Sequence, residues 1–142
     1  MFADMTTPLY TATAVSTGDA RNGHVRSRDG LIDTDVRFPQ GMGGTGGATN
    51  PEQLFAAGYS ACFHQAIKIV AGKAGADATD STVTGHVTIS DNDGGFLLSA
   101  KLDIALPNVE AELARRLVDE AHQLCPYSNA TRGNIEVELS VA

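Results

Sequence analysis

The run NPEQLFAAGYSACFHQAIKIVAG, residues 50–72, limits the possible folds more than any other segment. Asn50 suits the position before a helix, Pro51 suits its first position, and Glu52 is favourable near the positive end of the helix dipole. The pattern predicts a helix over residues 51–71. Its apolar side chains face nearly every direction, so we expect a long helix that is buried on most sides.

The segment before this helix carries two strand patterns. Residues 8–15 are rich in β-forming side chains, and residues 31–38 alternate between polar and apolar. Residues 18–30 lie between them and are polar, with several turn residues, so the pattern predicts a connection there.

The segment after the helix contains the clearest hairpin signal, residues 82–90 and 96–106 joined by an Asp-Gly turn. Asn108 is the expected cap of a second, amphipathic helix over residues 109–125, which a proline ends. Residues 134–141 alternate and predict a last strand. The order strand, strand, helix, strand, strand, helix, strand indicates an α+β fold with antiparallel sheets.

The composition narrows the classes of function. The chain has 142 residues, 42% of them hydrophobic, and a formal net charge of −7. This length suits a single domain over residues 1–142. An acidic chain argues against nucleic acid or an anionic membrane as a partner. No basic-then-apolar leader and no membrane-spanning run is visible, so we expect a cytoplasmic protein.

The glycine-rich loop before the first helix contains a G-x-G-x-x-G match at Gly41, Gly43 and Gly46. The dinucleotide fingerprint needs its last glycine in the opening turn of the helix and an acidic residue about 20 positions later, at the end of a strand. Here the helix starts only at Pro51, and the residue 20 positions after Gly46 is Ala66, inside that helix. The loop is therefore interpreted as structural.

The chain has two cysteines, Cys62 in the long helix and Cys125 at the end of the second one. Cys62 can be a core thiol, a metal ligand, half of a structural disulfide or a nucleophile. From this helix alone a core thiol is favoured, since free cysteine is usually buried and inert, and a cytoplasmic location disfavours a structural disulfide. A zinc site that used both cysteines with His64 and His122 would need distorted geometry. All the histidines are expected to be solvent-facing or hydrogen-bonded: His24, His64, His86 and His122.

A nucleophilic Cys62 would need a cation from elsewhere in the chain. It lies about three turns into the helix, beyond useful reach of the helix dipole. The polar segment 18–30 offers Arg21, Arg26 and Arg28. A buried guanidinium needs its own counter-charge, which Glu52 can supply. The residues thus permit a Cys–Arg–Glu network without requiring one.

Two motifs, NPEQLFAAGYSACF and CPYSNATRGNIEVELSV, resemble those of the organic hydroperoxide resistance (Ohr) subfamily of the OsmC/Ohr proteins. YTATA and GGTGGATNPEQ match as well, so the resemblance covers nearly the whole chain. It implies an OsmC/Ohr-like fold and an intertwined homodimer with active sites at the subunit interface. It also implies a thiol peroxidase that reduces organic (alkyl or lipid) hydroperoxides. No bound cofactor is implied, because the electrons come from dihydrolipoyl groups on a lipoylated partner protein.

The resemblance also assigns a positioning pair. The glutamate of NPEQ, here Glu52, positions an arginine that the family carries in a GGRDGR segment. This chain reads GDARNGHV there, and matching RNG to RDG gives Arg21. The second arginine of that segment becomes His24, and Arg26 remains the alternative to Arg21.

The same motifs make Cys62 the peroxidatic cysteine and Cys125 the resolving one. The Cys62 thiolate, stabilised by Arg21, would attack the distal peroxide oxygen and become a sulfenic acid. Cys125 would condense with it to form a Cys62–Cys125 disulfide, for which the two Cα atoms must come within about 7 Å. The alternatives are a broader-range OsmC-type peroxidase with another reductant, a non-enzymatic redox sensor, and a metal-binding protein.

Overall fold

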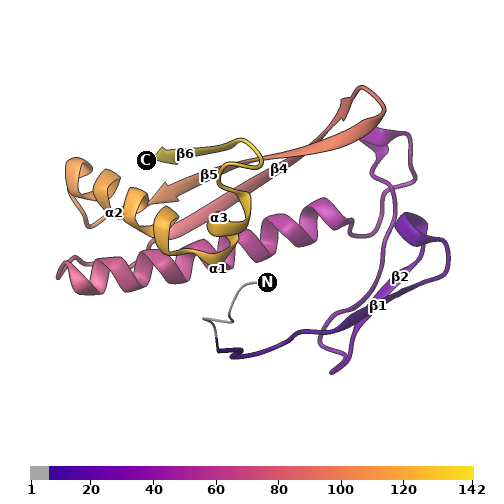
Figure 1. Ribbon diagram of the computed structural model, residues 1–142, viewed down its shortest axis with the longest axis horizontal. Helices are drawn as coiled ribbons and strands as arrows, with labels where there is room; N and C mark the ends of the chain where they lie inside the picture. Colours follow the sequence, from indigo (N-terminus) through magenta and orange to yellow (C-terminus); the bar gives the residue numbers. More distant parts are fainter. Residues whose placement is uncertain (1–6) are drawn as a thin grey trace, which may run out of the picture. The chain divides into compact units, whose positions relative to one another are not determined.

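The structure, a computed structural model of the chain, describes residues 7–142 (Figure 1). The chain divides into two compact units, one that ends at Pro51 and one that spans Glu52–Ala142. Each unit carries one three-stranded sheet. The α+β fold class is confirmed, whereas the single domain over residues 1–142 stays a prediction.

The first unit is built on an antiparallel sheet with the order β1-β2-β3. Two short 3₁₀ turns accompany the strands: η1 lies in the loop between β1 and β2, and η2 lies in the glycine-rich loop. The elements are β1 (Ala14–Thr17), η1 (Ala20–Asn22), β2 (His24–Ser27), β3 (Asp33–Asp35) and η2 (Gln40–Met42). Val36, just after β3, is buried and apolar, and no other apolar residue between positions 7 and 50 is buried.

The boundaries in this unit differ from the expected ones. The strand expected over residues 31–38 is only three residues long, and the one expected over 8–15 is displaced to β1. β2 lies within residues 18–30, where the pattern predicts a connection. The pattern misses β2 because its pairing with β3 brings charged and polar side chains opposite each other. Such a strand lacks the alternation of apolar residues by which strands are recognised.

The second unit contains the long helix and most of the apolar core. Its elements are α1 (Pro51–Lys73), β4 (Thr82–Asn92), β5 (Gly95–Ala105), α2 (Ala111–Leu124), α3 (Pro126–Thr131) and β6 (Val137–Val141). The expected helix over 51–71 and the expected hairpin are both confirmed, as α1 and as the antiparallel pair β4–β5. The expectation of purely antiparallel sheets is wrong for β6, which pairs parallel to β5. Helices α2 and α3 form a crossover between these strands, and a crossover of that length permits parallel pairing.

The second helix begins later than expected. Its N-cap is Glu110, whose carboxylate accepts hydrogen bonds from the backbone N–H groups of Leu113 at 2.7 Å and Glu112 at 3.3 Å. Asn108 is therefore not the cap; its side chain donates to the carbonyl of Thr79 at 3.1 Å. A carboxylate at this end also interacts favourably with the helix dipole.

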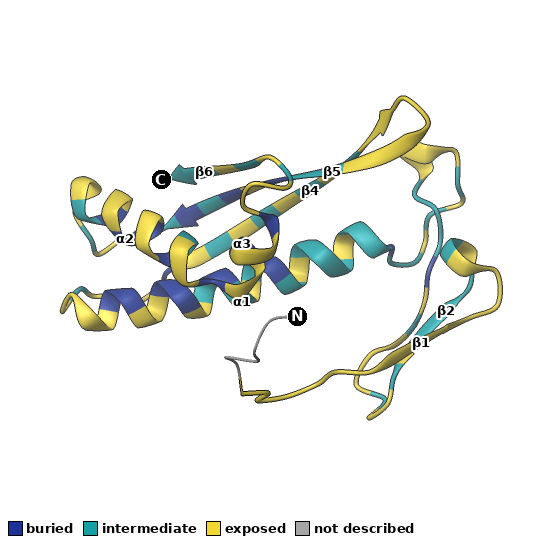
Figure 2. Cartoon of the chain, viewed as in Figure 1, coloured by how far each residue is buried: buried dark blue, intermediate teal, exposed yellow. Residues whose placement is uncertain are grey.

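The core of the second unit joins α1 to β5 and α2. Its largest buried apolar side chains come from all three elements: Tyr59, Phe63, Ile67, Leu102, Ile104 and Leu117. Figure 2 shows buried and exposed residues interspersed along the later turns of α1, whereas its first turns are intermediate or exposed. Ala57, Ala61 and Ile69 are exposed, so burial on most sides is wrong for the single chain, in which one face of the helix is covered. None of the helices within residues 7–142 is long and apolar enough to cross a membrane.

The backbone angles of the glycine-rich loop support its interpretation as a structural loop. Gly43 and Gly46 adopt φ angles of 80° and 64°. These lie in the left-handed region, which glycine enters without steric cost. The backbone path of the loop accounts for these glycines.

Candidate active site

The fold brings the two cysteines together. Cys62 lies on α1, and Cys125 lies at the bend between α2 and α3. Their Sγ atoms are 3.5 Å apart, and the Cys125 thiol donates to the Cys62 sulfur. Both are free thiols, 63 residues apart in the sequence. Their closeness is what a disulfide between them requires, while their chemical roles stay predictions.

The bend holds Cys125 through its own backbone. Its N–H donates to the carbonyl of Ala121 at 2.8 Å, and its carbonyl accepts from Asn129 at 3.0 Å. Cys125 is therefore both the C-cap of α2 and the N-cap of α3. Pro126 ends α2 as expected, because it lacks an N–H, and its fixed φ then suits the first position of α3. The pattern does not predict α3, which is only six residues long.

The two thiols differ in their surroundings. Cys125 is fully buried, whereas Cys62 is partly buried. Burial raises the pKa of the Cys62 thiol, an N–H from the Tyr127 backbone opposes that rise, and the neighbouring Cys125 adds to it. A thiolate at Cys62 therefore needs further stabilisation by a positive charge. Motif reasoning missed the Tyr127 N–H, since a backbone donor leaves no trace in residue type.

Three aromatic rings cluster on α1 and α3, on the elements that flank the two cysteines. The Phe55 ring stacks on Tyr59 at a centroid distance of 5.9 Å, and Tyr127 contacts both, at 6.1 Å and 5.8 Å. Tyr127 remains 40% exposed, whereas Tyr59 is fully buried. Gly58 leaves room for this ring, because a Cβ there would lie 3.1 Å from the Tyr127 hydroxyl. The cluster places an apolar surface on the turn of α1 before Cys62.

Arg21 lies in a tightly shaped loop of the first unit. It belongs to η1, and its guanidinium carbon is 6.0 Å from the centroid of the Phe38 ring. Ala20 before it has a φ of 53°, a left-handed conformation that costs energy for alanine. At Gly23, a Cβ would collide with the Thr17 carbonyl, so the turn requires glycine. Such strain is typical of functional loops.

Arg26, the alternative, has a different environment. It is exposed, and its guanidinium lies 3.7 Å from the carboxylate of Asp33 in the same sheet. This contact is an ion pair within the sheet, and the choice of Arg21 over Arg26 as the residue that serves the thiol stays a prediction.

Glu52 lies in the first turn of α1. It precedes Cys62 by ten residues, a rise of about 15 Å along a helix. Its carboxylate must therefore act through another side chain rather than on the sulfur. Arg21 and Glu52 belong to different units. The network that joins Arg21, Glu52 and Cys62 stays a prediction.

All the histidines are hydrogen-bonded, as expected. His64 pairs with Ser81 at 2.9 Å, His86 with Asp103 at 2.8 Å and His122 with Ser128 at 2.9 Å; His24 pairs with Asp33 and Asp35. Among residues 7–142, no group of three or more His, Cys, Asp or Glu side chains is placed to hold a metal ion.

His24, which stands where the family segment has its second arginine, forms a pH-dependent bridge. Its Nδ1 lies 2.8 Å from Asp35, its Nε2 lies 2.6 Å from Asp33, and these hydrogen bonds raise the pKa of His24, with Asp35 contributing most. Arg26 and Arg37 approach the same carboxylates. A raised pKa in the folded state stabilises the fold below the unfolded value of about 6.5, and this stabilisation is lost as the pH rises through the folded value.

The expected result is a pH-dependent effect of His24→Asn. The urea midpoint of the native protein should exceed that of the variant by more at about pH 6 than at about pH 9, because the stabilisation is lost as the pH rises through the raised pKa of the folded state. Equal differences at both values would show that the bridge does not contribute through its charge.

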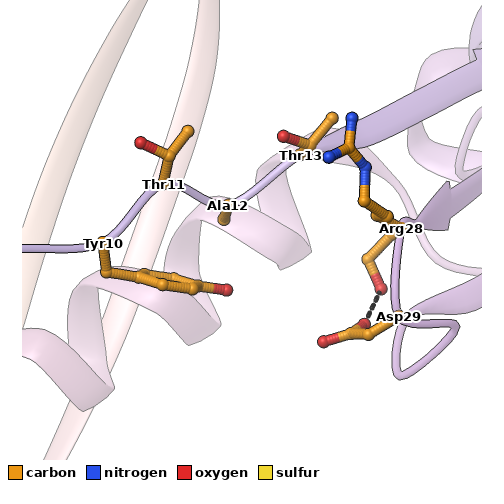
Figure 3. Close-up of a pocket in the computed structure, with 7 residues that line it drawn as sticks. Tyr10, Thr11, Ala12, Thr13, Arg28 and Asp29 are labelled. Carbon is orange, nitrogen blue, oxygen red and sulfur yellow. Dashed lines mark hydrogen bonds between the residues drawn. The ribbon is translucent and has the colours of Figure 1, made fainter.

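A separate pocket of about 250 Å³ lies in the first unit (Figure 3). It is formed by the extended chain before β1 and by the turn after β2, and it is lined by Tyr10, Thr11, Ala12, Thr13, Ser27, Arg28 and Asp29. Its lining includes neither cysteine, so it is not the thiol site.

Comparisons with known proteins agree with this fold and with the sequence motifs. The family model of OsmC-like proteins matches residues 44–140. An organic hydroperoxide resistance protein of Xanthomonas axonopodis pv. citri is 47% identical over 136 residues, which cover 94% of this chain and 95% of that protein. The organic hydroperoxide resistance protein OhrB of Bacillus subtilis is 43% identical over 137 residues, which cover 94% of this chain and 98% of that one.

Solved structures show the same relationship. The crystal structure of an organic hydroperoxide resistance protein from Legionella pneumophila matches with a TM-score of 0.90 and 46% identity, covering 96% of this chain and 99% of that one. The structure of OhrB from Bacillus subtilis matches with a TM-score of 0.86 and 42% identity, covering 95% and 100%. The chain therefore belongs to the OsmC-like family, among the organic hydroperoxide resistance proteins.

Proposed function

We propose that this protein is a thiol-dependent peroxidase that reduces organic hydroperoxides to alcohols. One observation carries the proposal: a partly buried thiol and a fully buried thiol have their sulfur atoms 3.5 Å apart. This arrangement suits a reaction in which the Cys62 thiol is oxidised to a sulfenic acid and the Cys125 thiol then forms a disulfide with it. The names of the similar proteins from Xanthomonas and Bacillus support organic hydroperoxides as the substrate class.

The proposed cycle has three balanced steps. The Cys62 thiolate attacks the distal oxygen of the hydroperoxide, the O–O bond breaks, and the alkoxide takes a proton and leaves as an alcohol. Cys62 is now a sulfenic acid, oxidised by two electrons. The Cys125 thiol attacks its sulfur, the disulfide forms, and the hydroxyl leaves with the thiol proton as water. A dihydrolipoyl dithiol on a partner protein then reduces the disulfide and becomes a cyclic disulfide itself.

The proposed cycle needs no bound cofactor, because the electrons pass from the lipoyl dithiol to the two cysteine sulfur atoms and from Cys62 to the peroxide oxygen. The aromatic cluster beside Cys62 supports an apolar substrate and the aliphatic lipoyl arm alike. A reducing compartment such as the cytoplasm suits cysteines that must return to the thiol state.

A coupled assay tests the reductant. With tert-butyl hydroperoxide as substrate, dihydrolipoamide is expected to sustain turnover far better than thioredoxin at equal dithiol concentration. Hydrogen peroxide in place of the organic substrate is expected to react more slowly, because it gains nothing from an apolar surface. If thioredoxin sustained turnover better, the lipoyl donor would be wrong. The alternative function, a broader-range OsmC-type peroxidase with another reductant, would then be favoured.

Arg21→Ala is expected to raise the pKa of the Cys62 thiol further and to slow peroxide reduction roughly 10²-fold, because a thiolate and a developing alkoxide both lose a cation. Thiolate absorbance as a function of pH measures the first effect. Arg26→Ala is the matched control and should leave both quantities near the native values. If only Arg26→Ala changes the titration, that residue has the role; if neither does, the Arg–thiolate step is wrong.

We further propose that the working unit is a homodimer. Several large apolar side chains are exposed in the single chain, among them Leu9 at 95%, Leu31 at 87% and Phe96 at 72%. Monomers rarely leave so many large apolar side chains in water, and a second copy would cover them. Sedimentation equilibrium should give twice the chain mass, and a monomer at micromolar concentration would contradict the proposal.

A further inference from the structure

A buried hydrogen-bond network runs beside the cysteine pair. The Tyr59 hydroxyl lies 2.8 Å from Ser128 Oγ and 3.1 Å from Thr131 Oγ1. His122 Nδ1 lies 2.9 Å from Ser128 Oγ, and the Thr131 hydroxyl donates to the Ser128 carbonyl at 3.2 Å. Tyr59 and Ser128 are fully buried, and Thr131 is 5% exposed. The network therefore links α1 and α3 through buried groups and reaches α2 at His122, which is partly buried.

The network and the cysteines form two parallel links between the same elements. Tyr59 precedes Cys62 by three residues on α1, so the two side chains lie on neighbouring turns of one face. His122 precedes Cys125 by three residues, and Ser128 follows it by three. Hydrogen bonds therefore hold the bend that carries Cys125 on both sides, at His122 and at Ser128. The bond from Ser128 to Tyr59 connects the bend directly to the helix that carries Cys62.

Counting one proton for each hydroxyl leaves a single direction in which all four contacts are hydrogen bonds. The Thr131 proton is used on the Ser128 carbonyl, because a carbonyl oxygen only accepts. The Tyr59 proton then goes to Thr131, and the Ser128 proton goes to Tyr59. The remaining contact, between Ser128 and His122 Nδ1, needs a proton on the ring nitrogen. Without that proton, two lone pairs would face each other at this partly buried contact.

His122 supplies that proton as a neutral ring. Burial lowers the pKa of His122, Arg132 lowers it further, and Asp119 opposes them. At neutral pH the ring therefore carries a single proton, which the network requires at Nδ1, leaving Nε2 unprotonated.

We propose that His122, Ser128 and Tyr59 are positioning residues for the formation of the Cys62–Cys125 disulfide. The chain of hydrogen bonds starts at an N–H on His122 Nδ1 and passes through Ser128 to Tyr59. It holds the Cys125 sulfur at its 3.5 Å contact with the sulfur on α1. The role in catalysis rests on the proposed function, whereas the geometry of the network does not.

The first test reads the proton directly. A long-range ¹H–¹⁵N correlation spectrum of the reduced full-length protein, recorded at neutral pH and assigned with a His122→Asn sample, is expected to show Nδ1 protonated and Nε2 bare. A His122 ring protonated at Nε2 alone would overturn the assigned direction of the network. This readout requires no enzymatic activity.

The second test measures disulfide formation with diamide, a general dithiol oxidant, and in parallel with tert-butyl hydroperoxide. Diamide adds to one thiol, and the second thiol displaces the hydrazine product as the disulfide forms. The displacement step in Tyr59→Phe and in Ser128→Ala is expected to be about tenfold slower than in the native protein, the loss typical of one buried hydrogen bond. Tyr10→Phe, the same change at an 81% exposed tyrosine, should keep the native rate.

Substitutions at His122 separate positioning from packing. His122→Asn keeps an N–H donor close to the position of Nδ1 and should retain the native rate of disulfide formation, whereas His122→Leu should be as slow as Ser128→Ala. Equal rates in all variants, or an asparagine variant as slow as the leucine one, would overturn the proposal. If hydroperoxide oxidises none of the proteins, the peroxidase proposal fails, while the diamide comparison still decides the positioning role.

Discussion

Replacement of Cys62 by serine is expected to abolish the reduction of organic hydroperoxides, with a loss of roughly 10⁴-fold or more. A serine hydroxyl stays protonated at neutral pH, and its oxygen cannot accept an oxygen atom from a peroxide as a thiolate does. The side chain is nearly the same size and can still accept from Cys125, which donates to this position at 3.5 Å. The loss should therefore be chemical and not structural.

The measurement is the consumption of tert-butyl hydroperoxide in the presence of dihydrolipoamide, with unfolding midpoints recorded for both proteins. A Cys62→Ser variant that folds normally and still turns over would show that the reacting atom lies elsewhere. Cys62→Ala provides the matched control, because it also removes the hydroxyl that could bind a stray metal or water.

Cys125→Ser is expected to change the course of the reaction rather than stop its first step. Cys62 should react once with hydroperoxide, and the sulfenic acid should then persist or be oxidised further to the sulfinic acid, because its resolving partner is gone. Steady turnover should end after about one equivalent per chain. Cys125 is fully buried, so the serine must keep a hydrogen bond to position 62 if it is not to destabilise the bend.

Intact-mass analysis after a single addition of hydroperoxide distinguishes these products. Sustained turnover by Cys125→Ser at the native rate would mean that an external thiol resolves Cys62 directly, and the intramolecular disulfide would have no part in the cycle.

Local patterns predict the parts of this fold that local physics determines. Pro51 and the apolar residues after it predict α1, and the Asp-Gly turn predicts the β4–β5 hairpin. Local patterns do not predict elements whose position depends on residues far away in the sequence. β2 is held by the bridge from His24 to Asp33 and Asp35, and the parallel pairing of β6 depends on the α2–α3 crossover.

The candidate site divides in the same way. The motifs around Cys62 and Cys125 single out both thiols, but nothing in their spacing of 63 residues gives the 3.5 Å contact. The bond between Tyr59 and Ser128 spans 69 residues, and tyrosine in an apolar helix otherwise suggests only a core residue. Side-chain hydrogen bonds between buried groups depend on the completed fold, so residue type alone cannot reveal them.

The central claim is that Cys62 and Cys125 form a reversible disulfide when an organic hydroperoxide is reduced. The most direct test is a thiol titration before and after a single equivalent of tert-butyl hydroperoxide, combined with a peptide map under non-reducing conditions. Both thiols of the chain should disappear together, the map should contain a Cys62–Cys125 link, and dihydrolipoamide should restore both thiols. Loss of one thiol, a link between two chains, or no loss at all would contradict the account.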